Sequence, residues 1–177
     1  MAEARLPEDI VIFCSIIYRD DEVLTKTLNM LYHKYGRLMY LSRPLNFDQT
    51  SYYNQELGSP LKRVIIAFDN LMPRNCLPEV KTWTNELEQK LSLDGQRRMN
   101  IDPGILCMES VNLATAKPYS HRFYLDKGIW GEVTLMYQGQ SYFTLEWTYP
   151  DYKTPQVIEI LNDIRKIYRR RRRCPEA

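Results

Sequence analysis

The stretch Asp9-Ile10-Val11-Ile12-Phe13-Cys14-Ser15-Ile16-Ile17-Tyr18 decides the fold. Its apolar residues form a nearly continuous run instead of alternating with polar ones. Such a run is typical of a strand that is buried on both faces. It is too short to cross a bilayer, and the acidic residues before it do not fit a signal peptide. We therefore expect residues 9–18 to form a central strand of a sheet, in a chain with no membrane segment.

Further helix and strand patterns follow along the chain. After the capping pair Asp20-Asp21, leucine and tyrosine recur every three or four residues up to Gly36, which predicts a helix. A second helix begins near Pro78 and ends at Asp94-Gly95. Asn85 and Glu88 lie on its other face, which we expect to be solvated. The predicted strands are 9–18, 37–42, 64–68 and 105–113, with a further strand at 122–125 and a hairpin of 129–137 with 141–147.

This order predicts an α+β fold. The first six elements match a ferredoxin-like βαββαβ unit with right-handed crossovers and its first and third strands in the centre. The two most apolar strands are those that this topology places centrally. The C-terminal hairpin and a last helix, which begins at Thr154-Pro155, extend the unit. We expect a single domain over residues 1–168 and a basic, disordered tail over residues 169–177.

The register of the hairpin follows from its alternation of apolar and polar residues. Matching the apolar faces pairs Leu135 with Phe143 and requires a loop of residues 138–140. The same register places Glu132 opposite Glu146, where like charges destabilise a sheet. A cation, a metal or a shared proton would offset the repulsion. The alternative is a solvated face on which the two carboxylates point apart.

A long connection joins the second and third strands, between Pro44 and Pro60. Connections of this length are uncommon in a compact domain unless they are functional or mobile. Its aromatic residues, including Tyr52 and Tyr53, predict a loop that closes over a site. A packed surface loop is an equally strong alternative.

Polar residues in the second half of the chain suggest a binding site. Asp102-Pro103-Gly104 predicts a turn, from which Asp102 would serve as a general base or metal ligand. Asn100 and Asp102 could instead bond only to the backbone of that turn. The basic residues Lys117, His121 and Arg122, on and after a polar connection, could bind a phosphate or carboxylate.

Two further groups complete the candidate site. Thr115 precedes the basic residues, and Asp151 lies in the aromatic stretch Trp147-Thr148-Tyr149-Pro150-Asp151-Tyr152. That stretch could wall a pocket that stacks a ring, or it could plug the core. The chain has no phosphate loop, dinucleotide fingerprint, nucleophile elbow or His-Glu-x-x-His zinc motif.

Charge and cysteine content bear on compartment and partners. The net charge is +2, but with Arg169–Arg173 set aside from the 24 basic residues, 19 basic residues face 22 acidic ones. The body is therefore mildly acidic. The arginines, Arg169, Arg170, Arg171, Arg172 and Arg173, could bind RNA, although a solvated helix end is commoner. Four cysteines without Cys-x-x-Cys spacing indicate reduced thiols in a cytoplasmic protein.

Several of these motifs resemble domain-of-unknown-function family 4416, over nearly the whole chain up to the arginines. They are Phe47-Asp48-Gln49-Thr50, Tyr52-Tyr53, Asn100–Gly104, Leu113-Ala114-Thr115, His121-Arg122, Glu132–Leu135 and Trp147–Tyr152. The resemblance implies a bacterial cytoplasmic protein without an established activity. Some members carry a GTP-binding label, which this sequence does not support because the phosphate loop is missing. Glu146 and the arginine run depart from the family pattern.

The first functional hypothesis is a small-molecule site for a phosphate- or nucleotide-like ligand, with an enzymatic role left open. Lys117, Arg122, Thr115, Tyr52, Tyr53 and Asp151 would bind the ligand. Asp102, His121 and Glu132 are the catalytic candidates, and Asp102 and Glu132 could hold a divalent cation. The alternatives are an RNA-associated or scaffold protein that uses the arginine-rich terminal helix, and a purely structural partner protein.

Overall fold

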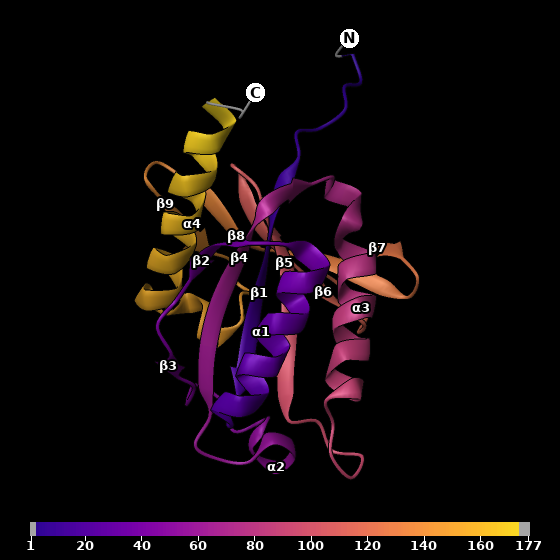
Figure 1. The fold of residues 1–177 in the computed structure, drawn as a ribbon. Helices are drawn as coiled ribbons and strands as arrows, with labels where there is room; N and C mark the ends of the chain where they lie inside the picture. Colours follow the sequence, from indigo (N-terminus) through magenta and orange to yellow (C-terminus); the bar gives the residue numbers. More distant parts are fainter. Residues whose placement is uncertain (1–2, 174–177) are drawn as a thin grey trace.

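The computed structural model describes residues 3–173. One sheet has the strand order β2-β4-β1-β5-β6-β8-β7, with β3 paired to β4 and β9 paired to β8 (Figure 1). All pairs are antiparallel. The elements are β1 Ile10–Tyr18, α1 Asp21–Tyr35, β2 Leu38–Leu41, β3 Leu45–Asn46, α2 Asn54–Leu57, β4 Lys62–Met72, α3 Leu77–Lys90, β5 Met99–Leu106, β6 Ser110–Thr115, β7 Phe123–Asp126, β8 Ile129–Gln138, β9 Ser141–Thr144 and α4 Pro155–Arg173, with 3-10 turns at Arg74–Cys76 and Pro150–Lys153.

The central strand β1 is buried along its whole length, as predicted. Ile12 and Ile16 lie in a core that also contains side chains of α1 and α3. Val11 and Phe13 lie in a second core on the opposite face, with side chains of α4. Helices therefore cover the sheet on both faces. The order β2-β4-β1-β5 places β1 and β4 inside this part of the sheet, which was also predicted.

The predicted ends of α1 and the predicted start of α4 are confirmed, whereas α3 ends at Lys90, before the predicted end at Asp94-Gly95. The side chain of Asp20 accepts a hydrogen bond from the backbone N–H of Glu22, at 2.8 Å, and caps α1. Gly36, with a φ of 89°, ends that helix. Thr154 accepts from the N–H of Val157 at 3.4 Å and caps α4, which begins at Pro155. The helix α4 continues to Arg173, and the rest of the predicted disordered tail lies outside the described residues.

The predicted fourth strand and the predicted Asp102-Pro103-Gly104 turn are both wrong. Residues 105–113 belong to two strands, β5 and β6, which reverse at 107–109. Asp102, Pro103 and Gly104 lie inside β5, opposite residues of β1. A β carbon on Gly104 would lie 2.5 Å from the Phe13 ring and 2.7 Å from the backbone oxygen of Asn112. The glycine is required by close packing and not by a turn.

The sheet splits between β5 and β6. The two strands pair only from Gly104 to Leu106, so the first half of β5 has no neighbour on that side. Side chains of α3 take the place of the missing strand. The Ile101 N–H donates to Glu88 at 2.5 Å, and Lys81 Nζ donates to the Ile101 carbonyl at 3.0 Å. Pro103 lies two residues further along β5, so its backbone nitrogen points to the same unpaired side of the strand. The N–H that proline lacks therefore removes no hydrogen bond from the sheet.

The predicted hairpin register is also wrong. Leu135 pairs with Thr144 and Met136 with Phe143, so the loop contains two residues, Gly139 and Gln140. Gly139 has a φ of 63°, which a two-residue loop requires and which the prediction overlooked. Because β9 ends at Thr144, Glu146 lies beyond the ladder and is exposed, and Glu132 does not face it. Glu132 is buried on the other side of β8, as described below.

The long connection from Arg43 to Leu61 has regular secondary structure of its own. It contains the short strand β3 and the helix α2. Phe47, Leu57 and Leu61 form a small core with Ile17 of β1. The connection therefore packs against the end of the sheet where β5 and β6 separate. Among the described helices, none has the length and apolar character needed to cross a membrane.

Candidate functional site

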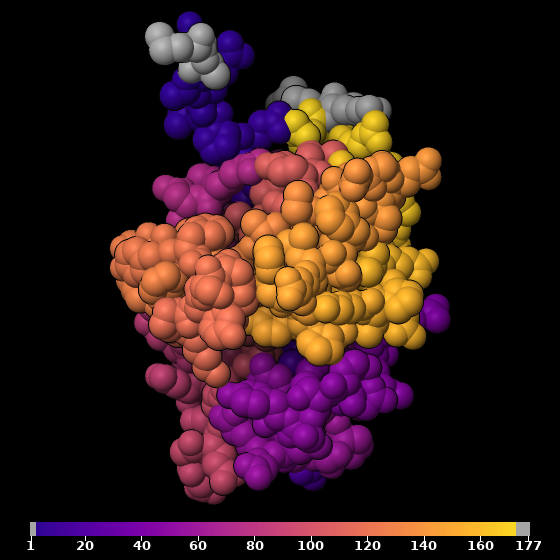
Figure 2. All heavy atoms as spheres, turned by 180° about the vertical axis from the view of Figure 1, so that it is seen from behind, coloured from indigo at the N-terminus to yellow at the C-terminus, as the bar shows by residue number. Residues whose placement is uncertain are grey.

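A cavity of about 650 Å³ lies at the split of the sheet. Its walls come from the N-terminal half of β5, the end of β6, one face of α3, the long connection and the 3-10 turn Pro150–Lys153. In Figure 2 the region that contains the connection, in purple, meets the segments from the second half of the chain, in orange and yellow, along a seam. The volume is within the range of small-molecule sites.

Most of the predicted site residues line this one cavity. They are Tyr52, Tyr53, Asp102, Thr115, Lys117, Arg122, Glu132 and Asp151. His121 is not among the lining residues, but its Nε2 lies 3.2 Å from Glu132 Oε2. Residues that are up to 99 positions apart in the sequence, from Tyr52 to Asp151, are thus brought together.

Glu132 and Arg122 form an enclosed ion pair. The Glu132 side chain is 1% exposed, and its Oε2 accepts from Arg122 Nε at 2.7 Å. The same guanidinium donates to the Lys117 carbonyl at 2.8 Å and to the Tyr149 hydroxyl at 2.6 Å. Burial and the neighbouring Glu132 raise the pKa of Tyr149 to about 12, so its hydroxyl remains protonated. Arg122 therefore holds three segments of the cavity wall together. Because its three nitrogen atoms already donate hydrogen bonds within the protein, it has little capacity left to bind a ligand.

His121 closes the outer side of this ion pair. Its ring stacks on Trp147, with centroids 5.3 Å apart and planes 12° apart. Trp147 is fixed in turn by a hydrogen bond from Nε1 to the Val133 carbonyl, at 2.8 Å. The arrangement shields Glu132 from solvent. It points to a role for His121 in positioning Glu132 and Arg122.

Asp102 faces the cavity more openly. Its side chain is 30% exposed, and Lys81 Nζ lies 3.4 Å from Oδ1. Asn100 donates to Oδ2 at 2.6 Å. Each carboxylate oxygen has one protein donor and room for another. Asp102 is thus the best placed of the three catalytic candidates to contact a bound molecule.

Asp151 is buried against an arginine that the sequence interpretation missed. Arg63 Nη2 lies 2.9 Å from Asp151 Oδ2, and the Arg63 side chain is 3% exposed. Arg63 Nε also donates to the Ser15 hydroxyl, at 2.7 Å. Burial raises the pKa of Asp151, and the charge of Arg63 opposes that rise. In the sequence, Arg63 follows Lys62 at the start of β4, before the apolar run, so no local signal revealed this pair.

The Tyr152 ring covers this ion pair, with its centroid 4.5 Å from the Arg63 guanidinium carbon. Its hydroxyl is buried beside Ser15 without a hydrogen bond of ordinary geometry. Buried hydroxyls are normally paired. Tyr152 also lines the cavity, but its hydroxyl is enclosed within the protein.

Arg97 was missed as well, and it ties the long connection to the sheet. It binds Glu56 of α2 through Nε and Nη2, at 2.5 and 2.6 Å, and Glu88 of α3 through Nη1, at 2.7 Å. The expectation that Glu88 and Asn85 are solvated is wrong for Glu88, which is 3% exposed, while Asn85 lines the cavity. Lys81 and Glu88 are seven residues apart, two helical turns, which places both on the face that covers the split.

Lys117 stands at the mouth of the cavity. Its Nζ lies 3.2 Å from the Tyr52 hydroxyl and 5.4 Å from the centre of that ring. Within the part of the chain that the structure describes, no carboxylate lies within ion-pairing distance of it. Among residues 3–173 there is also no group of three or more His, Cys, Asp or Glu side chains arranged to hold a metal. Asp102 and Glu132 each face a cation of the protein instead.

A family model with the description "domain of unknown function (DUF4416)" matches residues 8–168. The chain belongs to this family. The matched region contains every residue of the cavity, but not the arginine run, as the motifs led us to expect. Neither curated proteins nor solved structures gave a significant match. The function of this DUF4416 chain must therefore be argued from its own geometry.

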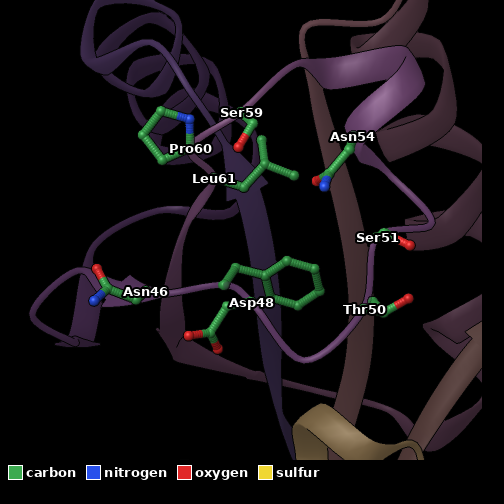
Figure 3. A pocket seen from close by; sticks show the side chains of 9 residues that line it. Asn46, Asp48, Thr50, Ser51, Asn54, Ser59, Pro60 and Leu61 are labelled. Atoms are coloured by element: carbon green, nitrogen blue, oxygen red, sulfur yellow. The ribbon is translucent and has the colours of Figure 1, made fainter.

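A second, smaller hollow of about 380 Å³ is formed by residues of the long connection itself (Figure 3). Its walls are the two ends of that connection, with Asn46 and Asp48 on one side and Asn54 and Ser59 on the other. Charged lining is limited to Asp48, which is exposed. It lacks the buried ion pairs that mark the first cavity of this DUF4416 protein.

The predicted nucleic-acid residues continue the last helix. Arg171 pairs with Asp69 and Arg172 with Glu8. Arg169 and Arg170 are exposed, and the Arg173 side chain lies outside the described residues. At least two of the five arginines are therefore engaged with the protein's own carboxylates.

Proposed function

We propose that the cavity at the split sheet binds a small polar molecule with an anionic group, a phosphate- or nucleotide-like ligand. The observation that carries this proposal is the convergence of eight polar and aromatic residues, chosen from sequence alone, on one cavity of ligand size. Buried ion pairs fix its walls, so the polar groups are held in place before a ligand enters.

An enzymatic use of the site would rest on Asp102. It is the candidate carboxylate that is open to the cavity, and a general base must lie within reach of the proton that it removes. Glu132 and His121 would act by positioning Arg122 and the wall. A divalent cation would have to be shared between Asp102 and the ligand, since the neighbouring carboxylates are already paired.

The nucleic-acid alternative has less support, because Arg171 and Arg172 are bound to acidic side chains. We further propose that β1-α1-β2-β4-α3-β5 is a ferredoxin-like unit, supported by the strand order and by the shared face of α1 and α3. Free, buried Cys14, Cys76 and Cys107 support the proposal of a cytoplasmic location. A bacterial origin is proposed on the family resemblance.

The proposal is tested by thermal unfolding of the purified chain with a panel of sugar phosphates and nucleotides. A ligand that binds only the folded protein raises the midpoint, by an amount that grows with its concentration. We expect at least one compound to do so, and expect Asp102→Asn to reduce the shift. Asp126→Asn, at the exposed last residue of β7, is the matched control. Shifts that are absent for every compound would overturn the proposal.

A further inference from the structure

The charges that surround the cavity are nearly all paired within the protein. The charged lining residues are Lys81, Arg97, Asp102, Lys117, Arg122, Glu132 and Asp151. Asp102 faces Lys81, Glu132 faces Arg122 and Asp151 faces Arg63. Arg97 serves two carboxylates, Glu56 and Glu88. Of the seven, Lys117 is the one for which the described chain provides no carboxylate.

This pairing limits the charge that the cavity can accept. A carboxylate near a second negative charge is destabilised unless a cation intervenes. One unpaired ammonium at the mouth can balance one anionic group. A polyphosphate would place its further charges near Asp102, Asp151 or Glu56, with no cation of the lining left unpaired to balance them.

The inner part of the cavity instead offers hydrogen-bonding groups. Asp102 can accept further donors. The Asn85 amide, which lines the cavity, makes no hydrogen bond within the described chain. Tyr53 and Tyr149 add aromatic surface beside these groups. Such a lining suits a ligand that carries hydroxyl or amino groups and a flat apolar face.

Resting on the proposed function, we infer that the ligand carries a single terminal anionic group. That group is bound at Lys117 and Tyr52, and the rest of the ligand, which carries hydroxyl or amino groups, is directed toward Asp102 and Asn85. A sugar monophosphate and a nucleoside monophosphate share this chemistry. Nucleoside di- and triphosphates do not fit it.

The test is isothermal titration calorimetry of the full chain at fixed, low ionic strength. The probes are ribose 5-phosphate, inorganic phosphate, and the mono-, di- and triphosphates of adenosine and guanosine. We expect the monophosphates to bind tighter than the matching di- and triphosphates. Binding of ribose 5-phosphate would indicate that a sugar phosphate is sufficient. Binding of nucleoside monophosphates without ribose 5-phosphate binding would indicate a nucleotide. Lys117→Gln should weaken monophosphate binding about tenfold, the loss of one hydrogen bond to a charged group. Lys34→Gln, at an exposed position of α1, is the matched control.

The outcomes separate this inference from the proposed function. Affinity that rises from mono- to triphosphate would overturn the single-anion assignment while leaving the proposed function intact. Monophosphate binding that is unchanged in Lys117→Gln would overturn the placement of the anion. No heat with any probe at millimolar concentration would overturn both.

Discussion

Glu132 illustrates how single residues set this site. A nearly enclosed carboxylate is costly unless a cation and hydrogen-bond donors surround it. Arg122 supplies the cation for Glu132, and the Thr134 hydroxyl lies 3.5 Å from the second carboxylate oxygen of Glu132. The stacked rings of His121 and Trp147 cover the carboxylate. The role of the pair is to brace the wall, because the same arginine holds the Lys117 carbonyl and the Tyr149 hydroxyl.

Removing the charge of Glu132 should therefore destabilise the protein. Glu132→Gln leaves the guanidinium of Arg122 enclosed without its carboxylate, at a cost of about 3–5 kcal/mol. Urea unfolding followed by tryptophan fluorescence measures the loss. Glu146→Gln, at an exposed glutamate nearby in the sequence, should change stability by less than about 0.5 kcal/mol. Equal stabilities for the two variants would contradict the bracing role.

Glu88 gives the protein a pH dependence with a defined sign. Burial raises the pKa of its carboxyl, although Lys81 and Arg97 oppose the rise. The folded protein then holds this proton more tightly than the unfolded chain. The contribution of Glu88 to stability is present at low pH and is lost as the pH rises through the folded pKa.

Glu88→Gln removes that titration while retaining an acceptor for the Ile101 N–H. The stability of the variant relative to the wild type should therefore increase between about pH 4 and neutrality. Unfolding free energies measured across this range test the sign. Glu86→Gln, at an exposed position of the same helix, is the charge-matched control. A relative stability that falls with pH would show that the carboxylate is favoured in the folded state.

At the scale of elements, the split between β5 and β6 creates the cavity. Gly104 allows the strands to meet closely on one side of the split, while α3 satisfies the open edge through Lys81 and Glu88. The connection between β3 and β4 then covers the opening and is held by Arg97. Neither a single strand nor a single loop would form a cavity of this kind.

Gly104→Ala should disrupt the close approach of the strands. Its added carbon would meet the Phe13 ring and the Asn112 backbone at under 3 Å, and relief of that overlap costs about 1–3 kcal/mol. Chemical unfolding measures the cost. Gly139→Asn provides the contrast, because asparagine tolerates the positive φ of that loop and nothing lies near the added carbon. Equal effects of the two changes would contradict the packing argument.

Arg97→Met should release the long connection. The variant loses both bonds to Glu56 and leaves buried Glu88 without its arginine. We expect faster limited proteolysis within residues 43–61, where opening exposes the backbone. Mass spectrometry of the fragments locates the cuts. Arg43→Met, which lies on an exposed part of the same connection, should keep the wild-type pattern. Cuts that appear first outside residues 43–61 would contradict the role of Arg97 in holding this connection.

For the whole molecule, the sequence predicted most helices and strands and most residues of the candidate site. It predicted less well how the strands pair. The central position of β1 followed from its nearly continuous apolar run, and eight residues chosen from sequence motifs line the cavity. The hairpin register failed because it was chosen by matching apolar residues across the strands, whereas the two-residue loop with Gly139 at positive φ pairs Leu135 with Thr144. Asp102-Pro103-Gly104 was misread because local turn chemistry gave no sign of the Phe13 ring against Gly104.

The supporting residues were harder to predict. Lys81, Glu88 and Arg97 have ordinary helix and loop positions in the sequence, and their burial depends on where the sheet opens. Long-range pairing sets that opening, and no local pattern encodes it. Arg63 was equally inconspicuous, because it follows Lys62 at the start of β4.

The central claim is that these distant residues form one binding cavity for a small anionic molecule. The most direct measurement is a ¹H–¹⁵N NMR titration of the labelled chain with a nucleoside monophosphate. Saturable shifts should gather at the backbone amides of Tyr53, Asn85, Asn100, Asp102 and Lys117, around the split. Shifts confined to Arg169–Arg173, or spectra unchanged at millimolar ligand, would contradict the account.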